Sequence, residues 1–332
     1  MSQRAFILGG SGQIGRAVAS TLLDAGWDVV SGQRDPATLT PWLQARGVDA
    51  VALDRDDTDA LAEAVSDGFD AVIDTVAYTD AHARQWLDLQ GRFSALAVIS
   101  TGSVYADDEG RTLDEARETG FPRFPVPIPE TQRRTAPGEA TYSTRKVAME
   151  GALLDGARIP LAILRPFAIY GPGCRSPREW WFIARVLAGA SEIPLAFDGQ
   201  SRFHTSATAN IAALCLAALQ RGGTQVLNAA DPEALTVAEI GQAILDAMGS
   251  RAHLIPFPGP PKGFRGRTPW SVEQPLVADM SAALAIGYKP VTDYHAAIDK
   301  TCEALIQAAQ GRPWREAFPG LAPYPSEMFE VG

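Results

Sequence analysis

Residues 5–15 read AFILGGSGQIG, an apolar run that is followed at once by three regularly spaced glycines. The run Ala5–Leu8 predicts a buried strand, and apolar residues then recur at helical spacing from Ile14 to Leu22. Gly26 ends this pattern and is a typical stop signal for a helix. The start of the chain therefore predicts a strand, a glycine turn and a helix.

The glycine turn has the spacing of a dinucleotide-binding site. Gly9 permits a sharp turn, Gly12 lets the main chain approach a pyrophosphate, and Gly15 allows close packing of the helix. The free amides at the helix N-terminus attract phosphate. Three glycines in a tight turn need no ligand, so the inference depends on the flanking strand and helix.

The alternation of short apolar strands and helices continues along the chain. Strands are predicted over residues 28–31, 48–53, 70–73, 95–99 and 161–164, with helical segments such as 58–65 between them. Such alternation favours right-handed crossovers and a parallel sheet covered on both faces. We expect an α/β fold with a doubly wound, Rossmann-like parallel sheet.

The composition changes after Arg165 to segments rich in proline and glycine, which predicts a smaller C-terminal α/β substrate domain. A helix over 211–219 and a strand over 225–228 are expected to return to the sheet, before a loop at 256–261 and a helix over 294–307. The predicted division is 1–165 plus about 203–231 for the dinucleotide-binding domain, and about 166–202 plus 232–332 for the substrate domain.

Composition excludes several classes of function. The 332 residues carry 29 basic and 39 acidic side chains, and this net charge of −10 disfavours nucleic acid as a partner. The first apolar run is too short for a signal peptide or a membrane span, so we expect a cytoplasmic protein without a membrane partner. The three cysteines and four histidines are scattered, and we expect neither a metal nor a disulfide.

The end of the second strand indicates which cofactor is bound. Gln33 stands where NAD-binding proteins place a carboxylate, and Arg34 could attract a 2′-phosphate. We therefore expect NADP, and keep NAD as the alternative in which Arg34 faces solvent and Asp35 holds the ribose. Asp54 and Arg55, after the third strand, are candidate contacts to the adenine edge, although a turn explains an Asp equally well.

A helix is predicted to begin at Tyr142, and its first turn places Tyr142 and Lys146 on one face. A phenol has a pKa of about 10, so a shift to about 7 needs roughly 4 kcal/mol of stabilisation of the phenolate. The Lys146 ammonium is the expected source, and it could also hold the ribose hydroxyls of a nicotinamide cofactor.

A hydroxyl follows the fifth strand, at the sheet edge where doubly wound folds bind ligands. Within Ser100–Tyr105, Thr101 could donate a hydrogen bond to a substrate carbonyl beside the Tyr142 phenol. These small polar residues could instead only cap and turn the chain. With the glycine turn, the three side chains predict an acid–base site.

The sequence resembles the extended short-chain dehydrogenase/reductase superfamily, in particular its NAD-dependent epimerase/dehydratase group, over roughly residues 4–310. Four motifs in the family's order carry the resemblance, and they are GGSGQIG at 9–15, VISTGSVY at 98–105, YSTRK at 142–146 and RPFAIYGPG at 165–173. The resemblance implies Thr101 as the catalytic Ser/Thr, Tyr142 as the acid/base and Lys146 as its helper. Arg34 resembles the 2′-phosphate arginine of NADP-using members. We also assign Gln13, Ile14, Ala77 and Pro166 to the cofactor site.

The sequence departs from the family at positions that bear on the reaction. The family's 4,6-dehydratases have Asp-Glu after the catalytic Thr, whereas Gly102-Ser103 stands here, which disfavours dehydration. Ala168 replaces an Asn of many sugar-nucleotide members, and Thr208-Ala209-Asn210 replaces a Val-Asp-Asp-like segment. The segment 78–97 is also shorter than usual.

We expect an NADP-preferring oxidoreductase that reduces a carbonyl, or oxidises a secondary alcohol, of a small molecule. The alternatives are an epimerase, acting on a nucleotide sugar or another sugar with bound NAD, and a dinucleotide-binding protein without catalysis. The identity of the substrate stays open, and so does the question of whether the protein forms a homodimer. So does the question of which aromatic and basic side chains line the pocket, among them Trp180, Trp181, Arg175, Arg178 and Arg202.

Overall fold

Strand β1 (Arg4–Leu8) lies inside a parallel sheet, and its side chains alternate between two buried faces. Ala5 and Ile7 pack with α1 (Gln13–Asp24) and α8 (Thr208–Arg221), whereas Phe6 and Leu8 pack against the opposite layer. The structure is a computed structural model that describes residues 2–330. Both faces of β1 are buried because each is covered by helices, which explains the uninterrupted apolar run in the sequence.

The sheet has seven strands in the order β10-β6-β5-β4-β1-β2-β3, and every neighbouring pair is parallel. The strands after β1 are β2 (Asp28–Gln33), β3 (Asp49–Ala52), β4 (Ala71–Asp74), β5 (Leu96–Ile99), β6 (Leu161–Pro166) and β10 (Thr224–Ala229). The predicted doubly wound, Rossmann-like fold is confirmed. The strand order reverses between β1 and β4, and ligands bind at such switch points.

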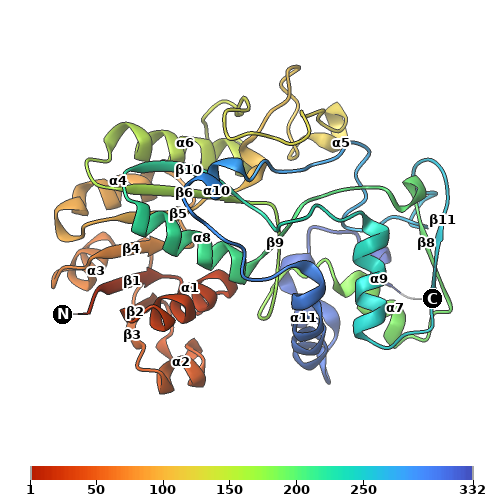
Figure 1. Ribbon diagram of the computed structural model, residues 1–332, viewed down its shortest axis with the longest axis horizontal. Coiled ribbons are helices and arrows are strands. Elements are labelled where there is room, and N and C mark those ends of the chain that lie inside the picture. The colour runs from red at the N-terminus through yellow and green to blue at the C-terminus, as the bar shows by residue number, and fades with distance from the viewer. Residues whose placement is uncertain (1, 331–332) are drawn as a thin grey trace.

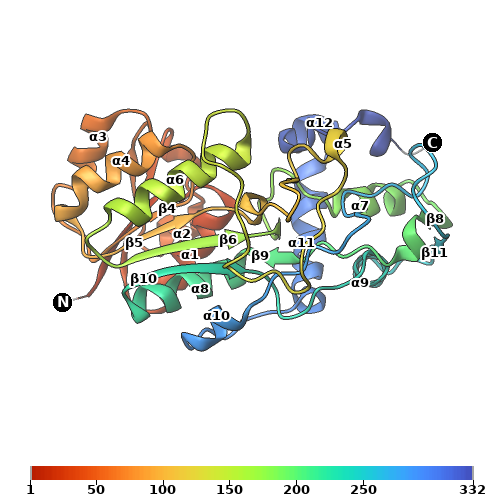
Figure 2. The same ribbon diagram turned by 90° about the horizontal axis from the view of Figure 1, so that it is seen from above.

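Helices cover both faces of this sheet (Figure 1). The layer opposite α1 and α8 contains α3 (Thr58–Ala64), α4 (Asp80–Leu89) and α6 (Tyr142–Gly156), as the view from above shows (Figure 2). The short α2 (Pro41–Ala45) lies beside α1, and α5 (Ala116–Thr119) lies in the long segment between β5 and α6. Helix α4 fills the short fourth crossover that the sequence predicted.

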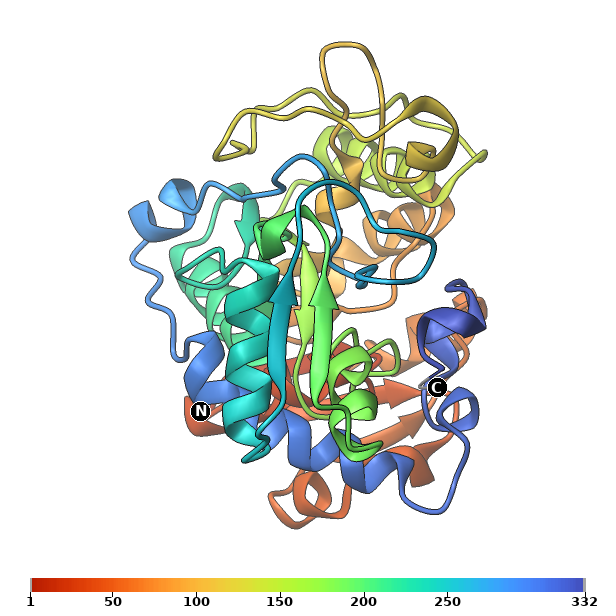
Figure 3. The same cartoon turned by 90° about the vertical axis from the view of Figure 1, so that its right-hand side faces the viewer.

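A second unit is built from two small parallel strand pairs and three main helices. The pairs are β7 (Ala168–Tyr170) with β9 (Thr205–Ala207), and β8 (Glu192–Leu195) with β11 (His253–Pro256). The helices are α7 (Trp180–Leu187), α9 (Val237–Ala247) and α11 (Tyr294–Ala309), followed by the short α12 (Trp314–Ala317). The short α10 (Ser281–Ala285) instead packs on the large sheet beside β10. In Figure 3, α7 and α9 lie on either side of the β8–β11 pair.

The aromatic cluster near residue 180 belongs to the core of this second unit. Trp181 and Phe182 are fully buried, and Trp180 packs against Phe318 with ring centroids 4.9 Å apart. Buried aromatic rings contribute large apolar areas to a core. The open question about Trp180 and Trp181 is therefore answered in favour of packing.

The chain passes between the two units five times. It leaves the large sheet where β6 runs into β7, returns through β9, α8 and β10, and continues into α9. It comes back to the large unit at α10, which packs beside β10, and then enters the second unit again at α11. The exact two-domain division given above stays a prediction, but this path explains why its boundaries are discontinuous.

Candidate active site

The glycine turn forms an open anion cradle at the start of α1. Gly9 has a φ of +88°, and the Gly12 amide donates to the Gly9 carbonyl at 2.9 Å. A Cβ at Gly15 would lie 2.2 Å from that same carbonyl oxygen, so Gly15 allows the helix to approach the turn itself. No side chain caps α1, which leaves its first amides free for phosphate.

The end of β2 presents the exposed Arg34 and then the exposed Asp35. The buried Gln33 accepts a hydrogen bond from Ser31 at 2.6 Å and donates to the Pro36 carbonyl. Arg34 is exposed, and it makes no ion pair within residues 2–330. Asp35 accepts from the Ala37 amide and caps a short 3-10 turn. The Asp35 carboxylate is therefore engaged locally.

The Arg55 side chain points into the protein and is held there by other residues. Its guanidinium lies 3.0 Å from the Asp74 carboxylate, donates to the His82 carbonyl and stacks over Trp86. Burial lowers the pKa of Arg55, while Asp74 opposes that shift. The expected contact of Arg55 with an adenine edge does not fit this geometry, because the buried Asp74 holds the side chain. Asp54 is exposed.

Asp74 also holds the loop after β4, a role that sequence patterns did not indicate. Its carboxylate accepts from the amides of Val76 and Ala77, at 2.9 and 2.7 Å, and from the Trp86 indole. The Ala77 carbonyl in turn accepts from Lys146 Nζ at 2.6 Å. Asp74 thus connects the strand end to the lysine of the candidate acid–base site.

Tyr142 and Lys146 share one face at the start of α6, as their spacing predicted. Thr141 caps this helix in a capping box with Thr144, which fixes the position of the first turn. Lys146 Nζ lies 5.9 Å from the centre of the Tyr142 ring, and it also donates to the Ile99 carbonyl at 2.9 Å.

The pKa values bear on one expectation. Burial lowers the pKa of Lys146 to about 8. Tyr142 is 45% exposed as a residue, yet burial of its hydroxyl raises its pKa to about 12, opposed by a hydrogen bond with Thr101. Lys146 therefore does not lower the pKa of the phenol in the protein alone, and the predicted shift stays a prediction for the complex with a nicotinamide cofactor. The ammonium donates to two backbone carbonyls, and desolvation outweighs its charge.

Thr101 joins Tyr142 at the carboxyl edge of the sheet. It follows β5, and its Oγ1 accepts from the Ser103 amide and donates to the Ser103 hydroxyl at 3.2 Å. A Cβ at Gly102 would lie 2.9 Å from the Phe167 ring. A side chain at position 102, acidic or not, would therefore need Phe167 to move.

A buried ionic network holds the elements of the site together, and sequence reasoning missed it. Glu150 lies one turn beyond Lys146 and accepts from Arg165 at 2.6 and 2.9 Å, from Arg134 at 2.8 Å and from Ser100 at 2.6 Å. Arg165 extends the network to the hydroxyl of Tyr105. The available signals were the four-residue repeat Tyr142-Lys146-Glu150 and an arginine inside a buried strand.

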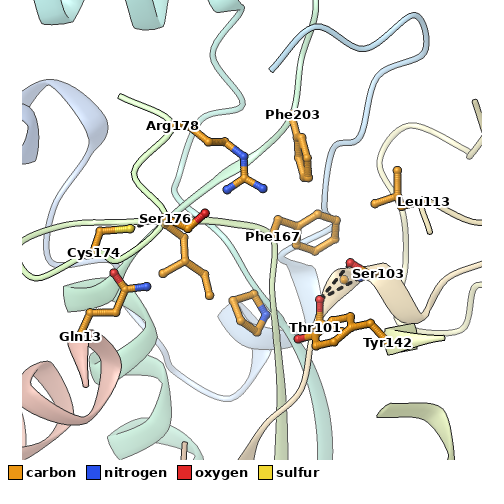
Figure 4. Close-up of a pocket in the computed structure, with 13 residues that line it drawn as sticks. Gln13, Thr101, Ser103, Leu113, Tyr142, Phe167, Cys174, Ser176, Arg178 and Phe203 are labelled. Carbon is orange, nitrogen blue, oxygen red and sulfur yellow. Dashed lines mark hydrogen bonds between the residues drawn. The ribbon is translucent and has the colours of Figure 1, made fainter. Parts of the chain in front are cut away.

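These side chains enclose a cavity of about 270 Å³ beside Tyr142 (Figure 4). Among its lining residues are four that the sequence assigned to the site, namely Gln13, Thr101, Tyr142 and Pro166. No Asp or Glu lines it. The cavity can therefore offer hydroxyl donors to a carbonyl oxygen, but no carboxylic acid.

The undecided arginines lie in different places. Arg178 lines the cavity, and its guanidinium points into it in Figure 4. Arg202 instead donates to the Ala234 carbonyl at 2.6 Å, and Arg175 is exposed. Only Arg178 of the three contributes charge to the cavity.

The remaining titratable groups suggest no second chemistry. Within residues 2–330, no three His, Cys, Asp or Glu side chains gather as a metal site would require. His204 is buried and accepts from the Ala278 amide through Nδ1. No helix in that range is both long and apolar enough to cross a membrane.

Comparisons with known proteins agree with this geometry. Residues 9–126 match the family model described as NAD(P)H-binding. A search of curated protein sequences found no significant match. The matched region spans the glycine turn, the Asp74 loop and Thr101.

Solved structures resemble the chain over nearly its full length. UDP-glucose 4-epimerase from Thermotoga maritima has a TM-score of 0.68 at 18% identity, covering 92% of this chain and 100% of its own. UDP-N-acetylglucosamine 4-epimerase from Bacillus cereus has a TM-score of 0.69 at 16% identity, with 91% and 99% covered. dTDP-glucose 4,6-dehydratase from Bacillus anthracis, solved with NAD, has a TM-score of 0.69 at 15% identity, with 96% and 100% covered. At these identities the likeness shows a shared fold.

Proposed function

We propose that this chain, which has the fold of the extended short-chain dehydrogenase/reductase superfamily, is an NAD(P)-dependent enzyme that acts on a secondary alcohol or the matching ketone. The observation that carries the proposal is the position of Tyr142 and Thr101 on one cavity, above the buried Lys146. The open glycine turn at the start of α1 fits the pyrophosphate of such a cofactor.

Each side chain has one role in the proposed reaction. Bound NAD(P) supplies or accepts the hydride at the substrate carbon. In the reductive direction Tyr142 donates its proton to the carbonyl oxygen, and Thr101 donates a hydrogen bond to the same oxygen. A phenol with a pKa of about 12 is protonated at neutral pH and is ready for that step. Lys146 holds the ribose hydroxyls and favours the phenolate that remains.

In the oxidative direction the same groups work in reverse. Tyr142 must then accept the proton of the alcohol, which needs a lower phenol pKa than the protein alone provides. A positive nicotinamide ring beside the phenol would supply part of that shift. The net reaction removes a proton and a hydride from the carbinol and leaves a ketone.

Two overall reactions are compatible with these roles, namely epimerisation and net reduction. The structural neighbours reported above are two sugar epimerases and a dehydratase, and their activities favour epimerisation, which inverts the carbinol carbon and would leave a retained NAD unchanged overall. Net reduction by exchangeable NADPH is the second candidate, because the exposed Arg34 could pair with a 2′-phosphate and β2 ends in Gln33 rather than in an acid.

Dehydration is the least supported outcome. Elimination of water needs an acid at the leaving hydroxyl, and no Asp or Glu lines the cavity. Gly102 is also packed against Phe167, so a carboxylate side chain after Thr101 would require Phe167 to move.

The test begins with the protein as purified from its host. Mass spectrometry of the denatured protein identifies any retained nucleotide, and retained NAD supports epimerisation whereas cofactor-free protein supports net reduction. Transfer of deuteride from labelled NAD(P)H to a bound ketone then tests the hydride step itself. Tyr142→Phe should stop this transfer, and Tyr78→Phe is the matched control because the Tyr78 ring stacks on Tyr142 at 5.5 Å. Equal transfer by the two variants would refute the assignment of Tyr142.

A further inference from the structure

The candidate catalytic cavity lies beside a second and larger chamber. This chamber has a volume of about 600 Å³, against about 270 Å³ for the cavity beside Tyr142. Four residues line both spaces, namely Ser103, Leu113, Arg178 and Phe203. The two spaces are therefore adjacent, and together they have the size of a pocket for a small organic ligand.

The outer chamber is mainly apolar and aromatic. Phe121, Phe197, Val272 and Met328 are among its lining residues, together with three prolines. Its two further charged side chains, Arg267 and Glu273, are exposed and of opposite sign. Such a lining favours an apolar body and offers it no net charge.

Arg178 lies where the two spaces meet, and it has a charge without a partner. Its guanidinium stacks over the Phe203 ring at 5.1 Å, and its Nε is buried without a hydrogen bond in the described part of the chain. It forms no ion pair there, although Glu179 is adjacent in sequence. Glu179 is fully buried, and burial raises its pKa to about 7, a shift that the nearby charge of Arg178 opposes.

Arg178 is half-buried, and a partly buried guanidinium without an ionic partner is a suitable site for an anion. A planar carboxylate matches the two parallel donors of an arginine. A pyrophosphate carries more negative charge than a carboxylate and would need further cations. The two other arginines do not supply them, because Arg202 donates to the Ala234 carbonyl and Arg175 faces solvent. The single guanidinium thus fits one carboxylate better than a nucleotide diphosphate.

We propose that the substrate is an apolar or aromatic hydroxy acid or keto acid, with its carboxylate on Arg178 and its apolar body in the outer chamber. The reacting carbon then lies beside Tyr142 and Thr101. The assignment rests on the proposed function, because it places that carbon in the same cavity. It adds the substrate class and makes Arg178 a binding residue.

Calorimetric titration of the holoenzyme, saturated with NAD or NADP, tests the carboxylate. The probes are 2-oxo-4-phenylbutanoate and 4-oxo-4-phenylbutanoate, and each is compared with its primary amide. At least one acid should bind about tenfold more tightly than its amide, because the hydrogen bonds to Arg178 are charge-assisted. Arg178→Gln should remove that difference, whereas the matched control Arg175→Gln should keep it.

A second variant tests the outer chamber. Ala116 lines that chamber and not the inner cavity, so Ala116→Phe narrows only the outer space. The variant should weaken binding of 2-oxo-4-phenylbutanoate several-fold more than binding of 2-oxobutanoate, which lacks the ring. Equal effects on the two acids would contradict the placement of the apolar body.

Two results would overturn the substrate class. One is that neither acid binds more tightly than its amide, and the other is that UDP binds more tightly than both acids and loses affinity in Arg178→Gln. The Tyr142→Phe variant separates this test from the proposed function. Loss of hydride transfer in Tyr142→Phe with no effect of Arg178→Gln refutes only the substrate class. Unchanged hydride transfer in Tyr142→Phe, with the acid preference intact, refutes only the acid–base assignment.

Discussion

The substitution Glu150→Gln should destabilise the protein by about 3–5 kcal/mol, the usual cost of leaving a buried charge unpaired. Glu150 is fully buried and Arg165 is 2% exposed, so water cannot replace the lost carboxylate. The substitution would weaken two hydrogen bonds from Arg165, at 2.6 and 2.9 Å, and one from Arg134. The loss falls on the elements that carry Thr101, Tyr142 and Lys146.

The assay is urea denaturation followed by circular dichroism at pH 7. The matched control is Asp24→Asn, which breaks the exposed 2.6 Å pair with Arg46 and should cost no more than about 1 kcal/mol. The double variant Glu150→Leu with Arg165→Met removes both buried charges and should recover much of the loss. A Glu150→Gln protein as stable as the Asp24→Asn protein would refute the reasoning.

The pH dependence has a definite sign. Burial opposes ionisation of Glu150, but the hydrogen bonds and charge of Arg165 outweigh it and hold the pKa of Glu150 below the ordinary value of 4.5. The stabilisation is therefore complete above the unfolded pKa and is lost as the pH falls through the lower, folded value. The cost of Glu150→Gln should shrink in acid, and a cost that grows below pH 4 would contradict this account.

Four further predictions concern the reaction. Tyr142→Phe should lower turnover by about 10²–10⁴-fold while cofactor affinity, measured by fluorescence titration, stays within a few-fold. NADPH should bind more tightly than NADH, and Arg34→Ala should abolish the preference; an equal or better NADH affinity in the unaltered protein would contradict the role of Arg34. Cofactor affinity should fall as the pH rises through about 8, where burial has placed the pKa of Lys146, and Lys146→Met should lack this inflection. Incubation with dTDP-glucose and NAD should give no 4-keto-6-deoxy product, because the cavity lacks an acid; detection of that product by mass spectrometry would show that another group supplies the proton.

The fold could be predicted because each strand of the large sheet is buried on both faces. Continuous apolar runs such as Ala5–Leu8, bounded by glycine or a helix start, are typical of such strands, and the predicted bounds differ from the observed ones by at most two residues at each end for this sheet. The pairing of Tyr142 with Lys146 was also predictable, because a helix fixes the geometry of residues four apart.

Side-chain contacts between elements that are distant in sequence could not be predicted from local sequence patterns. Arg55 looked like a ligand contact after β3, but Asp74, nineteen positions later, holds it in the interior. Arg178 and Arg202 belong to equally ambiguous loops, and only their packing against Phe203 and the Ala234 carbonyl distinguishes them. A side chain in a loop takes its role from partners that local sequence patterns do not specify.

The late return of α8 and β10 to the large sheet has a consequence for biosynthesis. Roughly 60 residues separate the end of β6 from the end of β10, and at about 5–20 residues per second a ribosome needs several seconds to make them. Until then the nascent chain lacks Ile211, Leu214 and Cys215, which cover one face of the sheet beside α1. An unfinished chain therefore exposes an apolar sheet face and the edge of β6, and is a natural client for a chaperone that binds near the ribosomal exit.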